Sequence, residues 1–216
     1  MAKVSPSILA ADFVNLERDI HQIEASQADW IHVDVMDGTF VPNFSFGLPA
    51  LKAVRRVTDM PLDVHLMIER PIRYVERFVA AGADWLTIHI EADTQENTME
   101  ALKKIRSMGS KAGISLKPGT GAEEAIPYLS LCDLVLVMTV QPGFGGQKFK
   151  EDMMPKLAAL RRCLDDVNPG CVLSVDGGID DITAPICKQN GAEILVTGSA
   201  YFRAADQKAY VRRLQA

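Results

Sequence analysis

Short apolar runs rich in β-branched residues alternate with longer amphipathic stretches from one end of the chain to the other. Eight of these runs are predicted to be strands, and they begin near Ser5, Ile31, Leu62, Leu86, Ala112, Leu134, Val172 and Ile194. Each interval between successive starts is long enough for a helical crossover. Between the runs, apolar residues such as Leu16, Ile20 and Ile23 recur at helical spacing. This alternation predicts a parallel sheet covered by helices.

The length of the chain indicates how many domains carry these eight units. The chain has 216 residues, of which 48% are hydrophobic, and no Ser/Pro-rich linker separates two halves. A (β/α)8 barrel of about 200–250 residues has this number of strands and crossovers. We therefore predict an α/β fold, a single TIM barrel over residues 1–216, with a doubly wound open sheet as the alternative.

The charge and the apolar pattern argue against several kinds of partner. The formal net charge is −5, so no overall attraction to nucleic acid or to an anionic membrane is expected. The chain starts without a basic and apolar leader, and no apolar run reaches the ~18 residues of a membrane span. The cysteines lack metal-type spacing and are expected to be reduced thiols: Cys132, Cys163, Cys171 and Cys187. We predict a cytoplasmic protein that binds any anion through a local site.

Three predicted strands contain polar residues, although a barrel strand should be apolar on both faces. The run Ile31–Val35 alternates polar with aliphatic residues, Leu62–Leu66 repeats this alternation, and Val172–Asp176 ends in a carboxylate. If the aliphatic residues face the helices, the polar side chains point into the mouth of the barrel, where such barrels carry their chemistry. The four candidate side chains are His32, Asp34, His65 and Asp176.

Two imidazoles and two carboxylates at one barrel mouth are typical of a divalent transition-metal site. Zn, Fe, Mn and Co all accept this ligand set, and the residue types do not choose among them. Buried carboxylates need a counter-charge, and no Lys or Arg lies within these strand ends. The alternative is a group of hydrogen-bonded polar residues near the core. We predict that the four side chains hold one divalent metal ion.

Asp34 and Asp176 also fit a catalytic role, because they come from two well-separated strands, the second and the seventh. A ligand between them could lose a carbon-bound proton to one carboxylate and receive a proton from the other on the opposite face. A metal ion next to a carbonyl and a hydroxyl would stabilise the intervening enediolate as a Lewis acid. This arrangement predicts inversion at one stereocentre, which is an epimerisation.

Three glycine-rich loops are predicted at the other half of the mouth. They follow the sixth, seventh and eighth strands, at Gln141–Gln147, Asp176–Gly178 and Gly198–Ser199. Backbone N–H groups of such loops and of helix N-termini bind phosphate without a basic side chain. Tight turns are the alternative explanation for any one glycine pair. Together the three loops predict a phosphate site near the last strands, as in other TIM barrels.

Three methionines and one histidine–carboxylate pair also lie near strand ends. Met36, Met67 and Met138 are either core residues or an apolar lining that keeps water away from the reacting carbon. His89 and Glu91 follow the fourth strand, and we expect them to be a structural pair rather than to support the metal site or contact substrate.

A series of specific motifs runs through nearly the whole chain. The segments are Pro6–Phe13, His32–Gly38, Phe40–Asn43, Asp63–Met67, Val137–Gln147, Val175–Ile179 and Gly198–Ser199. In this order and spacing they resemble the ribulose-phosphate 3-epimerase family. Gln141 departs from the small or acidic residue that the family more often has before the Pro-Gly pair.

The resemblance implies a TIM barrel of the ribulose-phosphate-binding type that interconverts D-ribulose 5-phosphate and D-xylulose 5-phosphate. It implies that the four strand-end residues hold one divalent ion, with Asp34 and Asp176 as the acid/base pair. The implied contacts to the phosphorylated ketopentose come from Ser7, His65, Gly143, Phe144, Gly145, Gly146, Asp176, Gly177, Gly178, Gly198 and Ser199. The family also forms homo-oligomers, dimers or hexamers, and we expect an oligomer here.

Three other functions share parts of this pattern. A sister epimerase for allulose 6-phosphate would have the same metal, aspartates and fold, but the intact Gly143–Gly146 loop favours the five-carbon sugar. A decarboxylase related to orotidine-phosphate decarboxylase would have a lysine where Met36 stands. A non-catalytic sugar-phosphate-binding barrel should have lost a strand-end Asp or His, and this chain retains all four.

Overall fold

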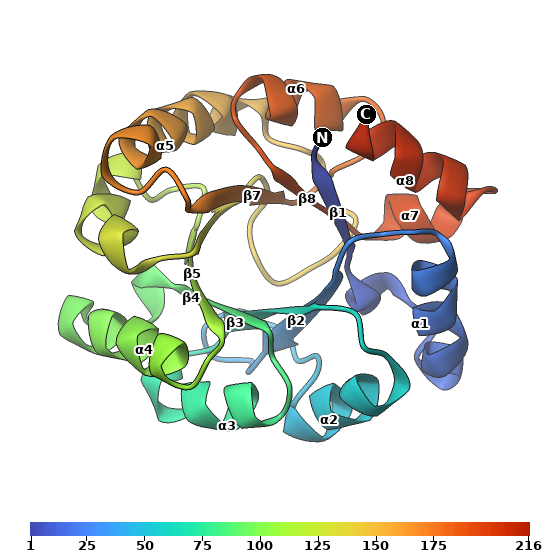
Figure 1. Ribbon diagram of the computed structural model, residues 1–216, viewed down its shortest axis with the longest axis horizontal. Coiled ribbons are helices and arrows are strands. Elements are labelled where there is room, and N and C mark those ends of the chain that lie inside the picture. The colour runs from blue at the N-terminus through green and yellow to red at the C-terminus, as the bar shows by residue number, and fades with distance from the viewer.

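The computed structural model describes residues 1–216 and has eight parallel strands arranged in a ring (Figure 1). The strands are β1 (Lys3–Pro6), β2 (Ile31–Met36), β3 (Leu62–Met67), β4 (Trp85–His89), β5 (Lys111–Leu116), β6 (Leu134–Met138), β7 (Val172–Asp176) and β8 (Ile194–Thr197). Strands β2 to β8 pair with their sequence neighbours, and β8 also pairs with β1. A bridge between Ser7 and His32 joins β1 to β2 and closes the ring. The predicted TIM barrel is confirmed, and the open-sheet alternative is wrong.

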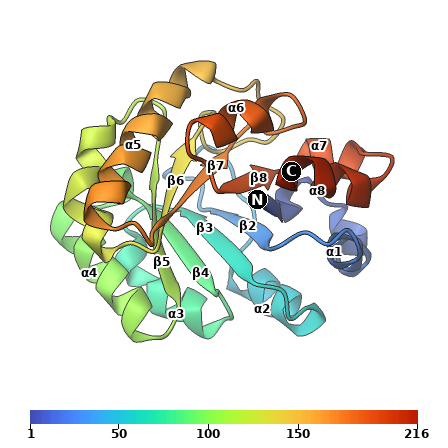
Figure 2. The ribbon, with the colours of Figure 1, turned by 45° about the horizontal axis from the view of Figure 1, so that its top comes forward.

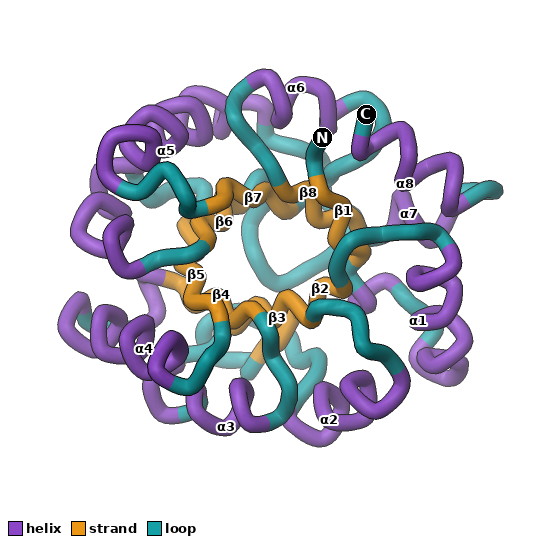
Figure 3. The backbone as a smooth tube through the Cα atoms, in the orientation of Figure 1, coloured by secondary structure: helices purple, strands orange, loops and turns teal.

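Helices surround the strands and cover the outer face of the ring (Figure 3). They are α1 (Leu16–Ala25), α2 (Leu48–Val57), α3 (Val75–Ala80), α4 (Gln95–Ser107), α5 (Met154–Val167), α6 (Thr183–Gln189), α7 (Ser199–Arg203) and α8 (Gln207–Gln215). The connection after β5 is instead a 3-10 helix over Ala122–Leu131. Pro127 lies inside this segment and has no backbone N–H to donate, which disfavours a regular α-helix there.

The apolar periodicity of the sequence accounts for both kinds of element. Five of the eight strands start at the predicted residue, and the other three start one or two residues earlier. In α1, Ile20 and Ile23 are buried, and in α5 the same is true of Leu157, Leu160 and Leu164. Burial of each such side chain contributes roughly 1.5–3 kcal/mol. The apolar residues whose spacing predicts these helices are therefore the same residues that hold them to the barrel.

Apolar side chains also fill the amino end of the barrel interior. The rings of Trp30 and Trp85 stack there with their centroids 4.6 Å apart. Leu134, Leu136 and Ile194 belong to the same cluster as Trp30. A larger cluster of 49 buried residues includes the outward side chains of the strands and the apolar faces of the helices. Because the amino end is packed, a ligand reaches the interior from the carboxyl ends of the strands.

The remaining segments connect the ends of the barrel. The loop that follows β6, tan in Figure 1, crosses the middle of the ring in that view. Figure 2 shows α3 and α4 outside β4 and β5. The two chain ends lie side by side, since the N–H of Ala2 donates to the carbonyl of Gln215 at 3.2 Å. None of the helices has the length and apolar character needed to span a membrane.

Candidate active site

A cavity of about 830 Å³ opens at the carboxyl ends of the strands. Its walls come from strand ends and from the glycine-rich loops after β6, β7 and β8. The predicted site residues that line it are Ser7, Asp34, Met36, Met67, Met138, Gly143, Phe144, Gly145, Gly146, Asp176, Gly177, Gly178, Gly198 and Ser199. The two others, His32 and His65, are fully buried beside Asp34. All the predicted site residues therefore gather at one end of the barrel.

The two histidines and two aspartates form one compact cluster beside the cavity. Strand β2 carries His32 and Asp34, β3 carries His65, and Asp176 is the last residue of β7. One potential ligand atom from each residue lies within 4.8 Å of the others. The parallel register places Asp34 directly opposite His65 on the neighbouring strand. Imidazole nitrogens and carboxylate oxygens at these separations fit a divalent transition-metal ion.

Asp34 is the centre of the hydrogen-bond network in this cluster. Its Oδ2 accepts a hydrogen bond of 2.6 Å from the hydroxyl of Ser7. Its Oδ1 lies 3.2 Å from Nε2 of His32 and 3.3 Å from Nδ1 of His65. Burial by itself would raise the pKa of Asp34, but the two imidazoles outweigh it and lower that pKa below its usual value. The Asp34 carboxylate is therefore ionised at neutral pH.

His32 is oriented by Asp63, a residue that the sequence analysis missed. Nδ1 of His32 lies 2.7 Å from Oδ2 of Asp63, and both side chains are buried. A carboxylate only accepts hydrogen bonds, so Nδ1 carries a proton and Nε2 faces Asp34. Burial disfavours a charged imidazole, yet Asp34 and Asp63 together raise the pKa of His32 well above its usual value. A metal ion would replace the proton on Nε2, with Asp63 holding the ring from behind.

Asp176 reaches the cluster from the other side of the ring, since β8 and β1 lie between β7 and β2. Its carboxyl is the most exposed of the four groups. Burial and the negative charge of Asp34 raise the pKa of Asp176 to about 6. The pKa values of the two carboxyls are thus displaced in opposite directions, which is the pattern of an acid/base pair. A bound divalent cation would lower both values.

The expected pair of His89 and Glu91 forms, and the structure also links it to this cluster. Nε2 of His65 lies 3.0 Å from Nε2 of His89, and Nδ1 of His89 lies 3.0 Å from Oε2 of Glu91. Oε1 of Glu91 accepts from the N–H of Lys117 at 2.6 Å and from the hydroxyl of Thr120 at 2.5 Å. Burial lowers the pKa of His89 to about 4. Burial opposes the charge of Glu91, but hydrogen bonds from His89, Thr120 and Lys117 lower its pKa to about 2.

The low pKa of His89 predicts a loss of stability in mild acid. Its pKa is about 4 in the folded protein and about 6.5 in the unfolded chain, so the unfolded chain binds more protons in that window. Stability therefore falls as the pH is lowered. Between pH 7 and pH 5, the metal-free wild type should lose about 2 kcal/mol more unfolding free energy than the His89→Gln variant.

Urea unfolding at the two pH values measures this difference. A His21→Gln variant removes an exposed histidine instead and should behave like the wild type. Equal losses in the wild type and in His89→Gln would show that His89 does not carry the effect.

Two glycines after β7 allow its turn to pack against the loop that follows β6. Gly177 and Gly178 have φ angles of +122° and +66°, which L side chains rarely adopt. A Cβ atom on Gly177 would lie 2.6 Å from the side chain of Val140. One on Gly178 would lie 2.7 Å from the backbone nitrogen of Phe149. These contacts leave no room for a side chain at this wall of the cavity.

A Gly178→Ala substitution is therefore expected to lower the unfolding free energy by about 1–3 kcal/mol through its strained φ angle alone. It should also raise KM for a phosphorylated substrate, because the added methyl group displaces Phe149 and the loop before it. Gly170→Ala is the control, since a Cβ there meets no atom within 4 Å. Urea unfolding and steady-state kinetics test both variants, and equal KM values would contradict the assignment of this wall to substrate.

Polar side chains connect the loops of this wall and add positive charge to it, a role that the sequence did not indicate for them. Nδ2 of Asn43 donates to the carbonyl of Gly143 at 2.8 Å, which ties the loop after β2 to the loop after β6. Lys148 and Arg203 line the cavity, and Arg203 donates to the hydroxyl of Ser199 at 2.8 Å. The glycine-rich end therefore offers two cations as well as backbone N–H groups to an anion.

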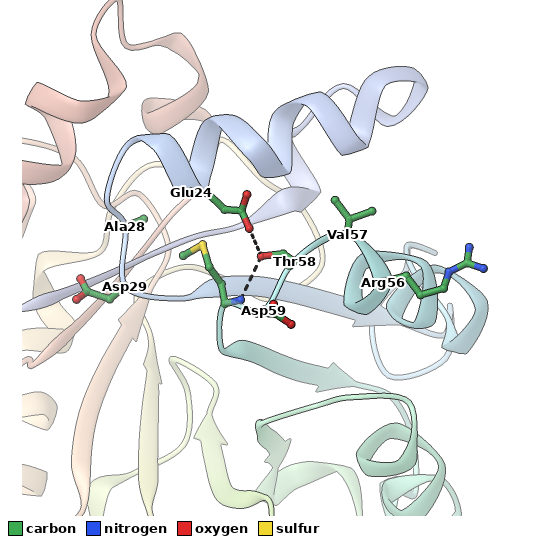
Figure 4. Close-up of a pocket in the computed structure, with 8 residues that line it drawn as sticks. Glu24, Ala28, Asp29, Arg56, Val57, Thr58 and Asp59 are labelled. Atoms are coloured by element: carbon green, nitrogen blue, oxygen red, sulfur yellow. Dashed lines mark hydrogen bonds between the residues drawn. The ribbon is translucent and has the colours of Figure 1, made fainter.

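A second hollow, of about 530 Å³, lies at the opposite end of the barrel beside the starts of β2 and β3 (Figure 4). It is lined by Glu24, Ala28, Asp29, Arg56, Val57, Thr58, Asp59 and Met60. The hydroxyl of Thr58 donates to Glu24 at 2.5 Å and accepts from the N–H of Met60 at 3.1 Å. Glu24 and Thr58 are paired with each other, and none of the predicted site residues lies here.

The fold and the site together define the class of protein. It is a (β/α)8-barrel enzyme whose cavity combines a His–Asp cluster fit for a divalent ion with a wall fit for an anion.

Comparison with known sequences identifies the family. A model of the family described as "Ribulose-phosphate 3 epimerase family" matches residues 3–202 of this chain. The chain is 45% identical over 216 residues to the ribulose-phosphate 3-epimerase of Bacillus subtilis (strain 168), covering 100% of this chain and 99% of that protein. It is 46% identical over 199 residues to the enzyme of the same name from Treponema pallidum (strain Nichols), covering 92% and 90%. The chain belongs to the ribulose-phosphate 3-epimerase family.

Two solved structures illustrate the similarity of the fold to proteins with other names. A crystal structure of KGPDC from Streptococcus mutans has a TM-score of 0.74 at 14% identity, covering 100% of this chain and 96% of that one. A crystal structure of 3-hexulose-6-phosphate synthase has a TM-score of 0.69 at 20% identity, covering 99% and 98%. At these identities the likeness concerns the fold alone.

Proposed function

We propose that the protein interconverts D-ribulose 5-phosphate and D-xylulose 5-phosphate by moving a proton at C3. The observation that carries this proposal is the pair Asp34 and Asp176, which reach one cluster from β2 and β7 with pKa values displaced in opposite directions. Relatives that are 45% and 46% identical and bear the name ribulose-phosphate 3-epimerase support the choice of substrate.

The two carboxyls divide the proton transfer between them. The ionised carboxylate of Asp34 accepts the C3 proton on one face of the sugar, and the C3–H electron pair becomes part of an enediolate. Asp176, protonated as the acid partner in this direction, returns a proton to C3 on the other face. The reverse reaction exchanges the two roles. The hydroxyl of Ser7 keeps the Asp34 carboxylate in place during both steps.

The cluster of two histidines and two aspartates, called here the metal-type cluster, would supply the charge stabilisation for this scheme. His32, Asp34, His65 and Asp176 would hold one divalent ion, of Zn, Fe, Mn or Co. When bound, the ion supplies Lewis-acid stabilisation of the negative charge that develops on the substrate oxygens. The buried side chains of Met36, Met67 and Met138 exclude water from the reacting carbon.

The phosphate end of the substrate occupies the glycine-rich wall. Backbone groups of the Gly143–Gly146 loop, of Gly177 and Gly178, and of Gly198 and Ser199 surround that end of the cavity. Phe144 is exposed at the tip of the β6 loop and covers the sugar from outside. Ser7, which lines the cavity, contacts the sugar at the other end. His65 was also expected to contact the sugar, but its ring is fully buried outside the cavity lining, so we assign it to the metal ion alone.

Proton NMR in D2O tests the proposal with purified protein and D-ribulose 5-phosphate. We expect loss of the C3 proton signal together with growth of xylulose 5-phosphate. Treatment with a chelator should stop both, and addition of a divalent ion should restore them. A parallel sample with allulose 6-phosphate tests the sister epimerase.

Each other outcome changes a particular part of the proposal. Turnover that survives demonstrated removal of the metal would refute the metal's role and keep the epimerase. Exchange with allulose 6-phosphate but not with the pentulose would mean the same chemistry on a six-carbon sugar. No exchange with either sugar would leave a sugar-phosphate-binding barrel without catalysis.

The domain organisation, oligomeric state and compartment of the enzyme are also part of the proposal. We infer that residues 1–216 act as a single catalytic domain, that copies of it form a dimer or hexamer, and that it works in the cytoplasm. A rice relative is named as a cytoplasmic isoform, which supports this compartment, whereas an Arabidopsis thaliana relative is named as chloroplastic. Sedimentation analysis of the purified protein decides the oligomeric state.

A further inference from the structure

A line of three buried or half-buried side chains leads away from the metal-type cluster toward the loop after β5. His65 lies on β3, His89 is the last residue of β4, and Glu91 lies in the 3-10 helix Ile90–Ala92 that follows. Both histidines are fully buried, and the ring centroids of the pair lie 5.0 Å apart. The shared Nε2–Nε2 distance of 3.0 Å is that of a hydrogen bond, so one of the two nitrogens donates and the other accepts.

The carboxylate at the end of the line decides which nitrogen donates. Glu91 only accepts, so the nitrogen of His89 that faces it, Nδ1, carries the proton. In a neutral imidazole the other nitrogen, Nε2, is then an acceptor. It faces His65, whose Nε2 must carry the second proton. The remaining nitrogen of His65, Nδ1, faces Oδ1 of Asp34 at 3.3 Å, and this carboxylate would also accept the single proton of a neutral ring. The hydrogen bonds from Glu91 through His89 therefore compete with Asp34 for the position of that proton.

Glu91 can play this part because both its oxygens are engaged as acceptors. Oε2 receives the hydrogen bond from His89, while Oε1 receives those from the N–H of Lys117 and the hydroxyl of Thr120. The backbone that holds Glu91 is fixed in turn, since Nζ of Lys156 donates to the carbonyls of Lys117 and Pro118 at 2.9 Å. A glutamine has one carbonyl oxygen and an NH2 group, so it cannot accept on both sides.

We propose that Glu91 is a positioning residue which, through His89, places the proton of His65 on Nε2 and leaves Nδ1 free to bind the metal ion. The proposal rests on the metal role of His65 in the proposed function. The other ligand histidine obtains the same control directly, from Asp63 at 2.7 Å. Both histidines of the cluster are thus oriented by a carboxylate. Asp63 contacts His32 directly, whereas Glu91 acts on His65 through His89.

Nitrogen NMR reads the proton positions without any measurement of activity. The chain has four histidines, so long-range 1H–15N spectra of uniformly labelled, metal-free protein contain four ring systems. In the wild type we expect the proton of His65 on Nε2 and that of His89 on Nδ1. A wild-type spectrum with the His65 proton on Nδ1 would overturn the proposal, and this result needs no variant to fold.

The Glu91→Gln variant supplies the second test. Its amide should shift His65 partly or wholly to the Nδ1–H form and weaken Zn²⁺ binding by about 10–100-fold, measured by competition with a chromophoric chelator. Glu123→Gln makes the same change of charge at an exposed residue on the segment after β5, and it should leave both readouts unchanged. A Glu91→Gln protein with the wild-type tautomers and a Zn²⁺ Kd within about threefold of wild type would refute the positioning role.

Failure of this proposal and failure of the proposed function give different results. A wild type that binds Zn²⁺ tightly with the expected tautomers, but does not epimerise, would overturn the proposed function alone. A wild type that epimerises with a metal, and whose Glu91→Gln variant keeps the tautomers and the Zn²⁺ affinity, would overturn the positioning role alone. A folded wild type that does not bind Zn²⁺ or any other divalent ion would overturn the positioning role together with the metal's part in the proposed function, and the NMR assay in D2O would then decide whether the epimerase remains.

Discussion

Replacing Asp176 by Asn is expected to lower kcat for pentulose-phosphate epimerisation by about 10²–10⁴-fold, the range for losing a group that transfers a proton. An amide cannot give a proton to C3 or take one from it, so one face of the sugar loses its acid/base group. Deuterium exchange at C3 should also become slow in the direction that needs Asp176 as the base. Steady-state kinetics and proton NMR in D2O measure the two effects.

The fold of this variant is expected to remain intact. Asp176 has a raised pKa in the folded metal-free protein, so its ionisation costs stability: the cost builds from about pH 4, where the unfolded carboxyl ionises, and is complete above about pH 6. Removal of that charge should leave the unfolding free energy at pH 7 equal to or above the wild-type value. Asp59→Asn makes the same chemical change at the opposite end of the barrel and should keep full activity. An active Asp176→Asn enzyme with native metal content would refute the two-aspartate mechanism.

Replacing Asp34 by Asn is expected to have the largest effect of any single substitution. Like Asp176 it is an acid/base group and a metal ligand, but its carboxylate is also the centre of the hydrogen-bond network in the cluster. The carboxylate faces both histidines and accepts from Ser7, whereas an amide would direct an NH2 group toward one of these partners. Zn²⁺ affinity should fall at least as far as the ~10–100-fold loss caused by a residue that only orients a ligand. The value of kcat should fall at least as far as in Asp176→Asn.

Metal content separates the two aspartate variants. After equilibration with Zn²⁺, Asp34→Asn should carry less metal than Asp176→Asn, because Asp34 lies between both histidines. Full metal occupancy in Asp34→Asn would show that the carboxylate is not a ligand. Full activity in the same variant would show that the base lies elsewhere.

The two metal-type histidines illustrate how far sequence reasoning extends into the site. The alternation in β2 and β3 is a local property of each strand, and it places His32, Asp34 and His65 on inward faces. Asp63 has the same spacing from His65 that His32 has from Asp34, so the inward direction of the Asp63 side chain could also have been predicted. Its partner was not, because the ring that Asp63 contacts belongs to the neighbouring strand and its tilt depends on the packing around it.

The link from His65 through His89 to Glu91 was missed for a related reason. The spacing of His89 and Glu91 identified them as a pair, and the two do contact each other. The sequence does not show which way a buried imidazole points beyond its own strand. That direction follows from the closeness of β3 and β4 and from the loop after β5, whose backbone and Thr120 hold Glu91.

The helical crossover after β5 shows the same limit at the level of the fold. The interval between β5 and β6 is long enough for an α-helix, but the structure has a 3-10 segment there. Pro127 was visible in the sequence, and its missing N–H disfavours a regular helix. The packing of this segment against α4 and α5 decided which irregular form it takes.

By itself the sequence determined the number of strands and crossovers, the inward faces of those strands, and the residue types that gather at the mouth, because each of these follows from periodicity within one segment. Only the tertiary structure decided which of those residues meet. Ser7 reaches Asp34 through the bridge that closes the ring, Asp176 approaches from across it, and Asn43 holds Gly143 although 100 residues separate them. Such contacts depend on the register and curvature of the whole closed sheet, which no single segment encodes.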